Sequence, residues 1–202
     1  MSNAVEKRYS PSEAEIRAAT EGERRTIGGY AVRYNSPTVI TDRWGDQWLE
    51  EFSTGAFDES IATRSQKALW NHDTSKPLGS CKANTLRFNP DVMGLNYDVD
   101  VPNNSWGNDA YESVQRGDVD GSSFGFRALE DVWSRITYEG KEMLKRSIVK
   151  AELFEVSPCT FPAYGDSEIS CRSKDTFKES EQEKELRQRL ILKNKNKMKR
   201  GM

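Results

Sequence analysis

Runs of β-branched and aromatic residues recur between residues 26 and 158 and predict β-strands, because some of them alternate regularly with polar residues. The clearest alternation is the segment 97–101, which reads Tyr-Asp-Val-Asp-Val, as expected of a strand with one buried face. Residues typical of turns, such as those at 35–37, separate the runs. The predicted strands are 26–34, 48–52, 67–70, 78–81, 85–88, 94–101, 122–129, 132–137, 142–146 and 148–158.

Two further segments have features of helices. Trp106, Ala110 and Val114 are spaced by four residues, which predicts a helix between residues 105 and 116 that ends at Gly117. Thr54 is the expected N-cap of another helix that runs from residue 55 past residue 61. Many short strands with about two helices indicate a mainly β protein, either a barrel or a sandwich with added helices.

Composition divides the 202 residues into three parts. Residues 1–24 are polar and predict a mobile N-terminal arm or a short helix, whereas 25–170 contain the predicted strands and form the main domain, closed by 161–165. Residues 171–202 are rich in Glu and Lys and predict one amphipathic helix at most. The chain has a net charge of −2 although its last 31 residues are strongly basic, so the main domain is acidic. This asymmetry suggests that the tail has its own role or is removed.

Composition also excludes several classes of protein. The chain has no apolar run that could span a bilayer and no signal peptide, so we expect a soluble protein inside a cell. Cys81, Cys159 and Cys171 are far apart, which argues against a zinc site or a disulfide framework. With one histidine and no clustered ligands, we expect no metal and no cofactor. Nucleic-acid binding through the basic run 193–200 is not expected, because the main domain is acidic.

The candidate chemistry depends on that single histidine, His72, and on a Gly-x-Ser-x-Gly match at 121–125. A serine hydrolase needs a base that accepts a proton near neutral pH, and imidazole is the usual one. In an α/β-hydrolase the serine lies on a strand-to-helix turn and the histidine follows it in the chain. Here the histidine comes first and the sequence after Gly125 continues as a strand, so this architecture is disfavoured.

The strand predicted over 122–129 gives the serines different surroundings. Alternation places Phe124 and Phe126 on one face, packed inward, and Ser123 and Gly125 on the other. Gly125 would leave open space in which a substrate backbone could approach the Ser123 hydroxyl. Ser123 is therefore the candidate nucleophile, whereas Ser122 is assigned to a turn.

A third group should orient the imidazole of His72. Asp73 is adjacent, but neighbouring side chains on an extended chain point apart. Glu152 and Glu155 lie in the apolar strand 148–158, where a buried carboxylate needs a partner, and alternation places them on opposite faces. The residue pattern does not choose between them.

A set of short motifs occurs in a fixed order along residues 25–165. They are Gly29-Tyr30-Ala31-Val32, Gly55-Ala56-Phe57-Asp58, Trp70-Asn71-His72-Asp73 with Pro77-Leu78-Gly79, Gly94-Leu95, Gly121-Ser122-Ser123-Phe124-Gly125-Phe126, and Leu153-Phe154-Glu155-Val156-Ser157 with Pro162-Ala163-Tyr164. This ordered set resembles the prohead (capsid maturation) serine proteases of tailed bacteriophages, a family distantly similar to herpesvirus assemblin.

The resemblance implies a serine endopeptidase with an assemblin-like β-barrel surrounded by a few helices. It assigns Ser123 as the nucleophile, His72 as the base and Glu155 as the acid that orients His72. Assemblins use a Ser-His-His site, which a chain with one histidine cannot build. By analogy with assemblin, the oxyanion hole would lie around 163–165.

The resemblance also implies partners and a location. The expected substrates are the major capsid protein or its scaffold segment, other procapsid proteins and the chain itself, with the tail as a removable segment. The expected location is the procapsid interior in the host bacterial cytoplasm, or the cytoplasm for an integrated prophage, with a homo-oligomer as the suspected assembly. The alternative is a catalytically inactive scaffold or structural protein of the procapsid with the same fold.

Overall fold

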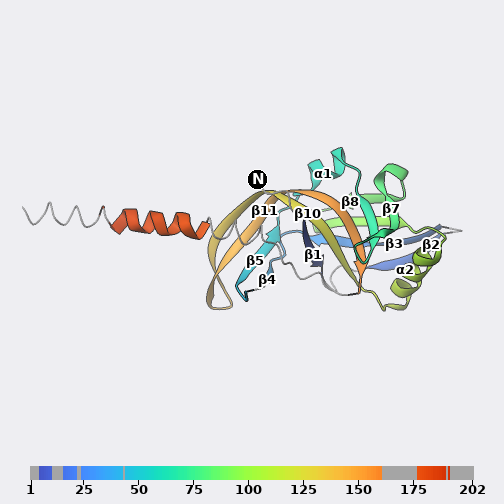
Figure 1. The fold of residues 1–202 in the computed structure, drawn as a ribbon, viewed down its shortest axis with the longest axis horizontal. Coiled ribbons are helices and arrows are strands. Elements are labelled where there is room, and N and C mark those ends of the chain that lie inside the picture. Colours follow the sequence, from blue (N-terminus) through green and yellow to red (C-terminus); the bar gives the residue numbers. More distant parts are fainter. Residues whose placement is uncertain are drawn as a thin grey trace, which may run out of the picture. The chain divides into compact units, whose positions relative to one another are not determined.

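The computed structural model describes residues 5–10, 16–21, 24–42, 44–160, 177–189 and 191. The chain divides into two compact units, Met1–Ser167 and Glu168–Met202. In the second unit, residues 177–189 form a helix (Figure 1). The run 193–200 and the segment 161–165, for which predictions were made, lie outside the described residues.

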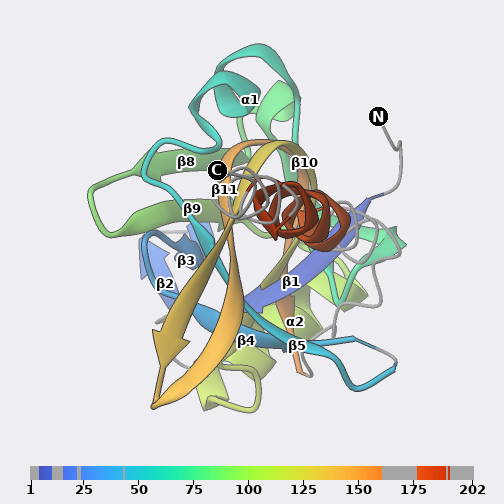
Figure 2. The ribbon, with the colours of Figure 1, turned by 90° about the vertical axis from the view of Figure 1, so that its left-hand side faces the viewer.

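The strands of the first unit form two sheets (Figures 1 and 2). The larger sheet has the order β1 (Glu6–Ser10), β10 (Gly121–Tyr138), β11 (Lys141–Cys159), β5 (Gln47–Phe52) and β4 (Thr38–Thr41), with β6 (Lys67–Trp70) pairing with β11 and with β7 (Asp73–Ser80). The smaller sheet has the order β2 (Arg17–Glu21), β3 (Arg24–Arg33), β9 (Gly94–Asp100) and β8 (Leu86–Pro90). A bridge between Tyr34 and Phe52 connects the end of β3 to β5.

The prediction of a mainly β protein with helices is therefore confirmed. The helices among the described residues of the first unit are α1 (Asp58–Thr63), α2 (Ser105–Arg116) and a 3-10 turn, η2 (Cys81–Ala83). The expected barrel is not found, since the strand pairings among the described residues close neither sheet. No helix in the part of the chain that the structure describes is long and apolar enough to cross a membrane.

The long hairpin of β10 and β11 is the central feature of the larger sheet and curves strongly in Figure 1. The sequence predicted four shorter strands here. The structure joins them in pairs, because β-bulges absorb the irregular positions without ending the strands. Glu139 and Gly140 form the turn with φ of +48° and +77°, a conformation that glycine adopts without steric cost.

An aromatic cluster fills the core beneath this hairpin. Phe124 and Phe126 pack against Phe52 and Phe57, with ring centroids 5.1 to 6.5 Å apart, and all four side chains are buried. Rings at such separations stabilise a core beyond the free energy of burying their area. The inward orientation predicted for Phe124 and Phe126 is confirmed, and it fixes which face of β10 the Ser123 side chain occupies.

Helix α2 has the predicted boundaries. The Asn104 side chain accepts a hydrogen bond from the Gly107 amide at the N-cap, and Gly117 ends the helix with φ of +79°. Ala110 and Val114 are buried. Thr54, by contrast, does not cap α1: the helix begins after Phe57, and the Thr54 hydroxyl accepts a hydrogen bond from Asn35 instead.

Residues 1–24 were expected to form a mobile arm or a short helix, but two strands, β1 and β2, lie in this range. β1 pairs antiparallel with β10, and β2 pairs antiparallel with β3. The charged side chains of Glu6 and Arg8 are buried in β1, which the polar composition did not predict. They are buried because charges distant in sequence compensate them, Glu50 for Arg8 and Arg146 for Glu6.

Candidate active site

Three segments meet at one end of the larger sheet and carry the predicted site residues. Ser123 lies on β10 and Glu155 on β11, while His72 lies in the turn between β6 and β7. The β10–β11 register places Ser123 opposite Ser157 and Gly125 opposite Glu155. Residues 123 and 125 share a face of β10, so their cross-strand partners Ser157 and Glu155 lie on that face as well.

The turn at His72 holds its imidazole over this face. Asn71 and His72 both have left-handed backbone conformations, with φ of +50° and +60°. Asn and His adopt this region more readily than most residues, but it still costs free energy that the surrounding contacts must offset. The Asn71 amide donates to the Pro158 carbonyl at 3.2 Å, the Thr160 amide donates to the Asn71 side-chain oxygen at 3.0 Å, and the His72 amide donates to the Ser157 hydroxyl at 3.2 Å.

The imidazole of His72 contacts both other predicted residues. Its Nε2 lies 2.6 Å from Ser123 Oγ, and its Nδ1 lies 2.7 Å from Glu155 Oε1. The side chains of His72 and Glu155 are only 11% and 12% exposed, and Ser123 is fully buried. When Glu155 is ionised it accepts a hydrogen bond from the Nδ1–H group, which leaves the Nε2 lone pair facing the hydroxyl.

Ser157 is a contributor that sequence analysis missed. Its hydroxyl donates a hydrogen bond of 2.6 Å to Glu155 Oε2 and accepts the bond from the His72 amide. It therefore links the carboxylate to the turn that carries the imidazole. Its position two residues after Glu155 could have indicated this contact, because residues two apart on a strand lie on the same face.

Gly125 has a different role from the one expected. We expected Gly125 to leave open space for a substrate backbone, but the Glu155 carboxylate occupies that space. A Cβ atom at position 125 would lie 2.7 Å from Glu155 Oε1, closer than real Cβ contacts. The glycine thus permits the carboxylate to lie against β10.

The carboxylates of Glu152 and Asp73 contact residues other than His72. Glu152 forms ion pairs with Arg127 and Arg64. The Asp73 carboxylate accepts hydrogen bonds from the amide and hydroxyl of Ser75. Neither makes the contact with the imidazole of His72 that Glu155 makes.

The expectation that Glu152 and Glu155 lie on opposite faces was wrong, because of a β-bulge. Gly125 pairs with Glu155 but Phe126 pairs with Leu153, so Phe154 is the extra residue of the bulge. Glu152 pairs with residue 127, which shares the face of residue 125, so the bulge brings both glutamates to one face.

Ser122 lies on β10 and not in the expected turn. Its hydroxyl is buried, donates to the Ser157 carbonyl at 3.4 Å and lies 3.3 Å from the Tyr97 hydroxyl. Burial raises the pKa of Tyr97, so its hydroxyl is neutral and able to donate. These contacts assign Ser122 to the interior of the sheet.

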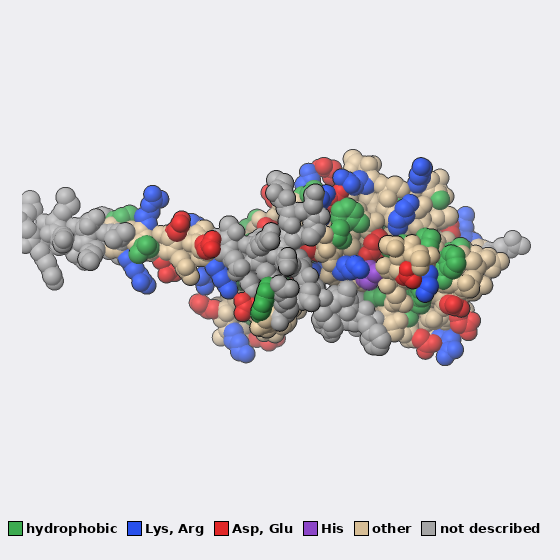
Figure 3. All heavy atoms as spheres, viewed as in Figure 1, with side chains coloured by type: hydrophobic (Ala, Val, Ile, Leu, Met, Phe, Trp, Pro, Cys, Tyr) green, Lys and Arg blue, Asp and Glu red, His purple; other side chains and the backbone are tan. Residues whose placement is uncertain are grey.

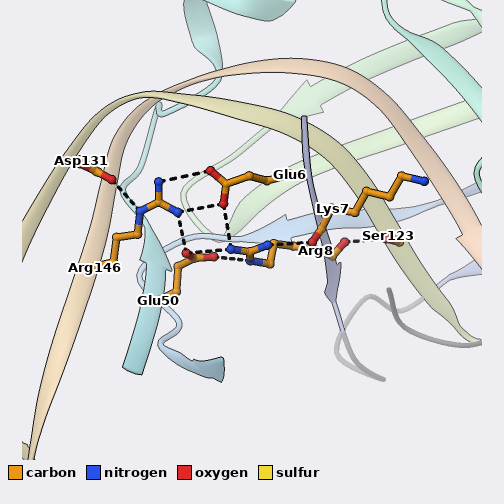
Figure 4. Close-up of polar contacts among 7 residues, drawn as sticks. All are labelled: Glu6, Lys7, Arg8, Glu50, Ser123, Asp131 and Arg146. Atoms are coloured by element: carbon orange, nitrogen blue, oxygen red, sulfur yellow. Dashed lines mark hydrogen bonds and ion pairs between the residues drawn. The ribbon is translucent and has the colours of Figure 1, made fainter. Parts of the chain in front are cut away.

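A backbone contact from β1 covers Ser123. The Ser123 hydroxyl donates a hydrogen bond of 2.7 Å to the carbonyl oxygen of Arg8 (Figure 4). β1 pairs with β10 so that Tyr9 is opposite Ser123 and Arg8 opposite Phe124. The N-terminal strand therefore lies along the edge of the strand that carries the predicted nucleophile, and this accounts for the burial of Ser123.

Among the described residues there is no group of three or more His, Cys, Asp or Glu side chains arranged to hold a metal ion. Cys159, at the end of β11, is buried, and burial together with the nearby Glu155 carboxylate raises the pKa of its thiol to about 12. The segment 163–165, predicted to supply the oxyanion hole, lies outside the described residues.

Comparisons with known proteins show to which family the chain belongs. Residues 12–182 match the family described as caudovirus prohead serine protease. Over 163 residues the chain is 31% identical to the prohead protease of Enterobacteria phage HK97, an alignment that covers 79% of this chain and 65% of that relative. The chain thus spans somewhat less than two thirds of the length of this relative. No solved structure matches the chain. The family match extends over most of the sequence, and the matched range contains His72, Ser123 and Glu155. The chain therefore belongs to the caudovirus prohead serine protease family.

Proposed function

We propose that this protein is a serine endopeptidase of phage prohead maturation, with Ser123 as nucleophile, His72 as general base and Glu155 as the group that orients the imidazole. The observation that carries the proposal is one imidazole bridging a hydroxyl and a carboxylate, with 2.6 Å to Ser123 Oγ and 2.7 Å to Glu155 Oε1. Such a chain of contacts makes a serine hydroxyl nucleophilic near neutral pH.

The chemistry follows from the orientation of the imidazole. The Nδ1–H group of His72 donates a hydrogen bond to Glu155 and keeps its proton, so Nε2 is free to take the hydroxyl proton while Ser123 Oγ attacks the carbonyl carbon of a peptide bond. His72 then gives this proton to the leaving amine, and the acyl group stays on Ser123. Water activated by the same imidazole releases the acyl group and restores the hydroxyl. The Ser157 hydroxyl holds the second carboxylate oxygen of Glu155 throughout.

The proposed substrates are proteins of the assembling procapsid: the major capsid protein or its scaffold segment, other procapsid proteins and the chain's own tail. The support is the family description and the printed name of the HK97 relative, a prohead protease. The proposed site of action is the procapsid interior in the bacterial cytoplasm. We also propose that the chain associates with copies of itself and that its fold is distantly similar to that of assemblin.

Nucleic acid is not a proposed partner. On the face drawn in Figure 3, described Lys and Arg side chains are interspersed with Asp and Glu. A nucleic-acid site instead gathers basic residues on one face, where they neutralise phosphates.

The burial of Ser123 under β1 favours a second candidate, a procapsid protein of the same family without activity. Co-expression of the chain with its capsid precursor separates the two candidates. Active enzyme converts the precursor to shorter products, and Ser123→Ala abolishes the conversion. Ser134→Ala, which changes another serine of β10 beyond the paired segment 122–126, is the matched control and leaves conversion unchanged. An intact precursor with the wild-type chain, or equal conversion by Ser123→Ala, would reject the endopeptidase.

A further inference from the structure

The strand β1 lies where a peptide substrate of this site would be expected to bind. It is the terminal strand of the larger sheet and pairs with β10 along residues 122–126, directly beside Ser123. The Arg8 carbonyl accepts the Ser123 hydroxyl at 2.7 Å, so the Arg8–Tyr9 peptide bond is brought next to the nucleophile. Addition of an extended peptide to a sheet edge is a common mode of peptide recognition, in which backbone bonds supply affinity and side-chain sites supply specificity.

Two charged side chains of β1 enter such side-chain sites. Glu6 and Arg8 are two residues apart and therefore on one face of the strand, and both are buried. Arg8 forms a two-point contact with Glu50 of β5, with Nε to Oε1 at 2.5 Å and Nη2 to Oε2 at 3.1 Å. Glu6 forms a two-point contact with Arg146 of β11, at 2.9 and 3.3 Å (Figure 4).

The receiving side of this cluster keeps its own charge pairs. Arg146 also binds Glu50 at 3.0 Å and Asp131 at 2.6 Å, so these three side chains hold one another without β1. They carry one positive and two negative charges, whereas Glu6 and Arg8 together are neutral. A strand that replaces β1 therefore meets two buried charged groups. The carboxylate of Glu50 fits a guanidinium or ammonium group, and the guanidinium of Arg146 fits a carboxylate. Like charges placed in these buried positions would be strongly disfavoured.

We propose that β1 occupies the substrate site, and that substrates bind in its place as an extended strand whose basic side chain contacts Glu50 and whose acidic side chain, two residues earlier, contacts Arg146. This inference rests on the proposed endopeptidase function for its chemistry. The bond that Ser123 attacks is the one that follows the basic residue, because the carbonyl in the position of Arg8 is the one next to the hydroxyl.

The same contact makes β1 an inhibitor of the resting site. A serine hydroxyl has one proton, and here the Arg8 carbonyl oxygen and His72 Nε2 both lie within accepting distance of it. While β1 is bound, its carbonyl competes with the general base for that proton. As a tethered strand it is present at an effective concentration in the millimolar range, so a substrate must displace it.

Binding of peptides to the full-length Ser123→Ala chain tests this inference without cleavage. One peptide contains Val-Glu-Lys-Arg-Tyr-Ser, the segment from residue 5 to residue 10, and the matched control has its Glu and Arg exchanged. At millimolar concentration the first peptide should increase amide hydrogen exchange of residues 6–10 at least tenfold, whereas the control peptide should leave it unchanged. Fluorescence anisotropy should give at least a tenfold tighter dissociation constant for the first peptide.

Adding Arg8→Ala to the Ser123→Ala chain weakens the internal competitor and should tighten binding of the first peptide at least tenfold. If the double variant does not fold, the exchange measurement on the single variant decides alone. Equal binding of the two peptides, or unchanged exchange of residues 6–10 with both, would overturn the inference.

The two proposals fail separately. Ser123-dependent cleavage of the capsid precursor combined with equal binding of both peptides rejects the role of β1 and retains the endopeptidase. Selective binding of the first peptide by a chain that cleaves nothing with Ser123 intact rejects the endopeptidase and retains the peptide site.

Discussion

Replacing Gly125 by alanine tests whether the close approach of Glu155 to β10 sets the geometry of the imidazole. An added Cβ would lie 2.7 Å from Glu155 Oε1, 3.3 Å from its Cγ and 3.4 Å from its Cδ. Position 125 is inside a strand and has no positive φ, so the backbone itself accepts alanine. The strain therefore falls on the carboxylate, which must retreat by roughly 0.7 Å to reach ordinary van der Waals contact.

That retreat acts on the oxygen that contacts the imidazole. Glu155 Oε1 lies 2.7 Å from His72 Nδ1, so the same displacement along this line lengthens the contact to roughly 3.4 Å, beyond good hydrogen-bond range. Displacements approaching 1 Å in an active site can cost about a hundredfold in rate. We therefore expect kcat/KM to fall about 10- to 100-fold, which corresponds to about 1.4 to 2.8 kcal/mol of transition-state stabilisation.

The assay is hydrolysis of a peptide whose cleavage depends on Ser123, with thermal unfolding measured in parallel. Val132→Ala, an exposed position on the same strand, is the control and should keep wild-type activity. In a Glu155→Ala background the added methyl group has no carboxylate to displace, so Gly125→Ala should cost less than about twofold there. Full activity of Gly125→Ala, or an equal loss in both backgrounds, would refute the reasoning.

Three other predictions concern buried charges and a thiol. Arg146→Met removes the cation shared by Glu6 and Glu50 and should lower the free energy of unfolding in denaturant by about 3 to 5 kcal/mol, whereas a loss under about 1 kcal/mol would contradict the buried cluster. Burial alone would raise the pKa of Glu50, but Arg8 and Arg146 outweigh this effect and hold the pKa below its ordinary value of 4.5. Ionised Glu50 therefore stabilises the fold above about pH 4.5. This stabilisation is lost as the pH falls through the lowered pKa. The difference in unfolding free energy between wild type and Glu50→Gln should therefore shrink on acidification from about pH 6 to about pH 3, and a constant difference would argue against it. Because the pKa of Cys159 is raised to about 12, iodoacetamide should alkylate it far more slowly in the native chain than in the unfolded chain at pH 8, and mass spectrometry showing equal rates would contradict its burial.

Local patterns predicted the parts of the site that depend on one element. Alternation along β10 placed Phe124 inward and Ser123 on the opposite face, and the end of β6 correctly marked the turn that carries His72. Such inferences succeed because a strand has a fixed two-residue period.

Contacts between distant segments were beyond the reach of these patterns. The bulge at Phe154 brings Glu152 to the same face of β11 as Glu155, so alternation alone could not rank one against the other. The burial of Glu6 and Arg8 depends on Glu50 and Arg146, which lie 42 to 140 residues away in sequence. A charged N-terminal segment therefore predicted a solvated arm, although the fold supplies its counter-charges.

The most direct test of the account is the reactivity of Ser123 itself. The native chain is incubated with diisopropyl fluorophosphate, and peptide mass spectrometry measures the rate of modification at each serine. If His72 activates the hydroxyl, Ser123 is modified selectively, and His72→Ala slows its modification by at least about a hundredfold. Modification of Ser123 at the same rate in the two chains would contradict the account.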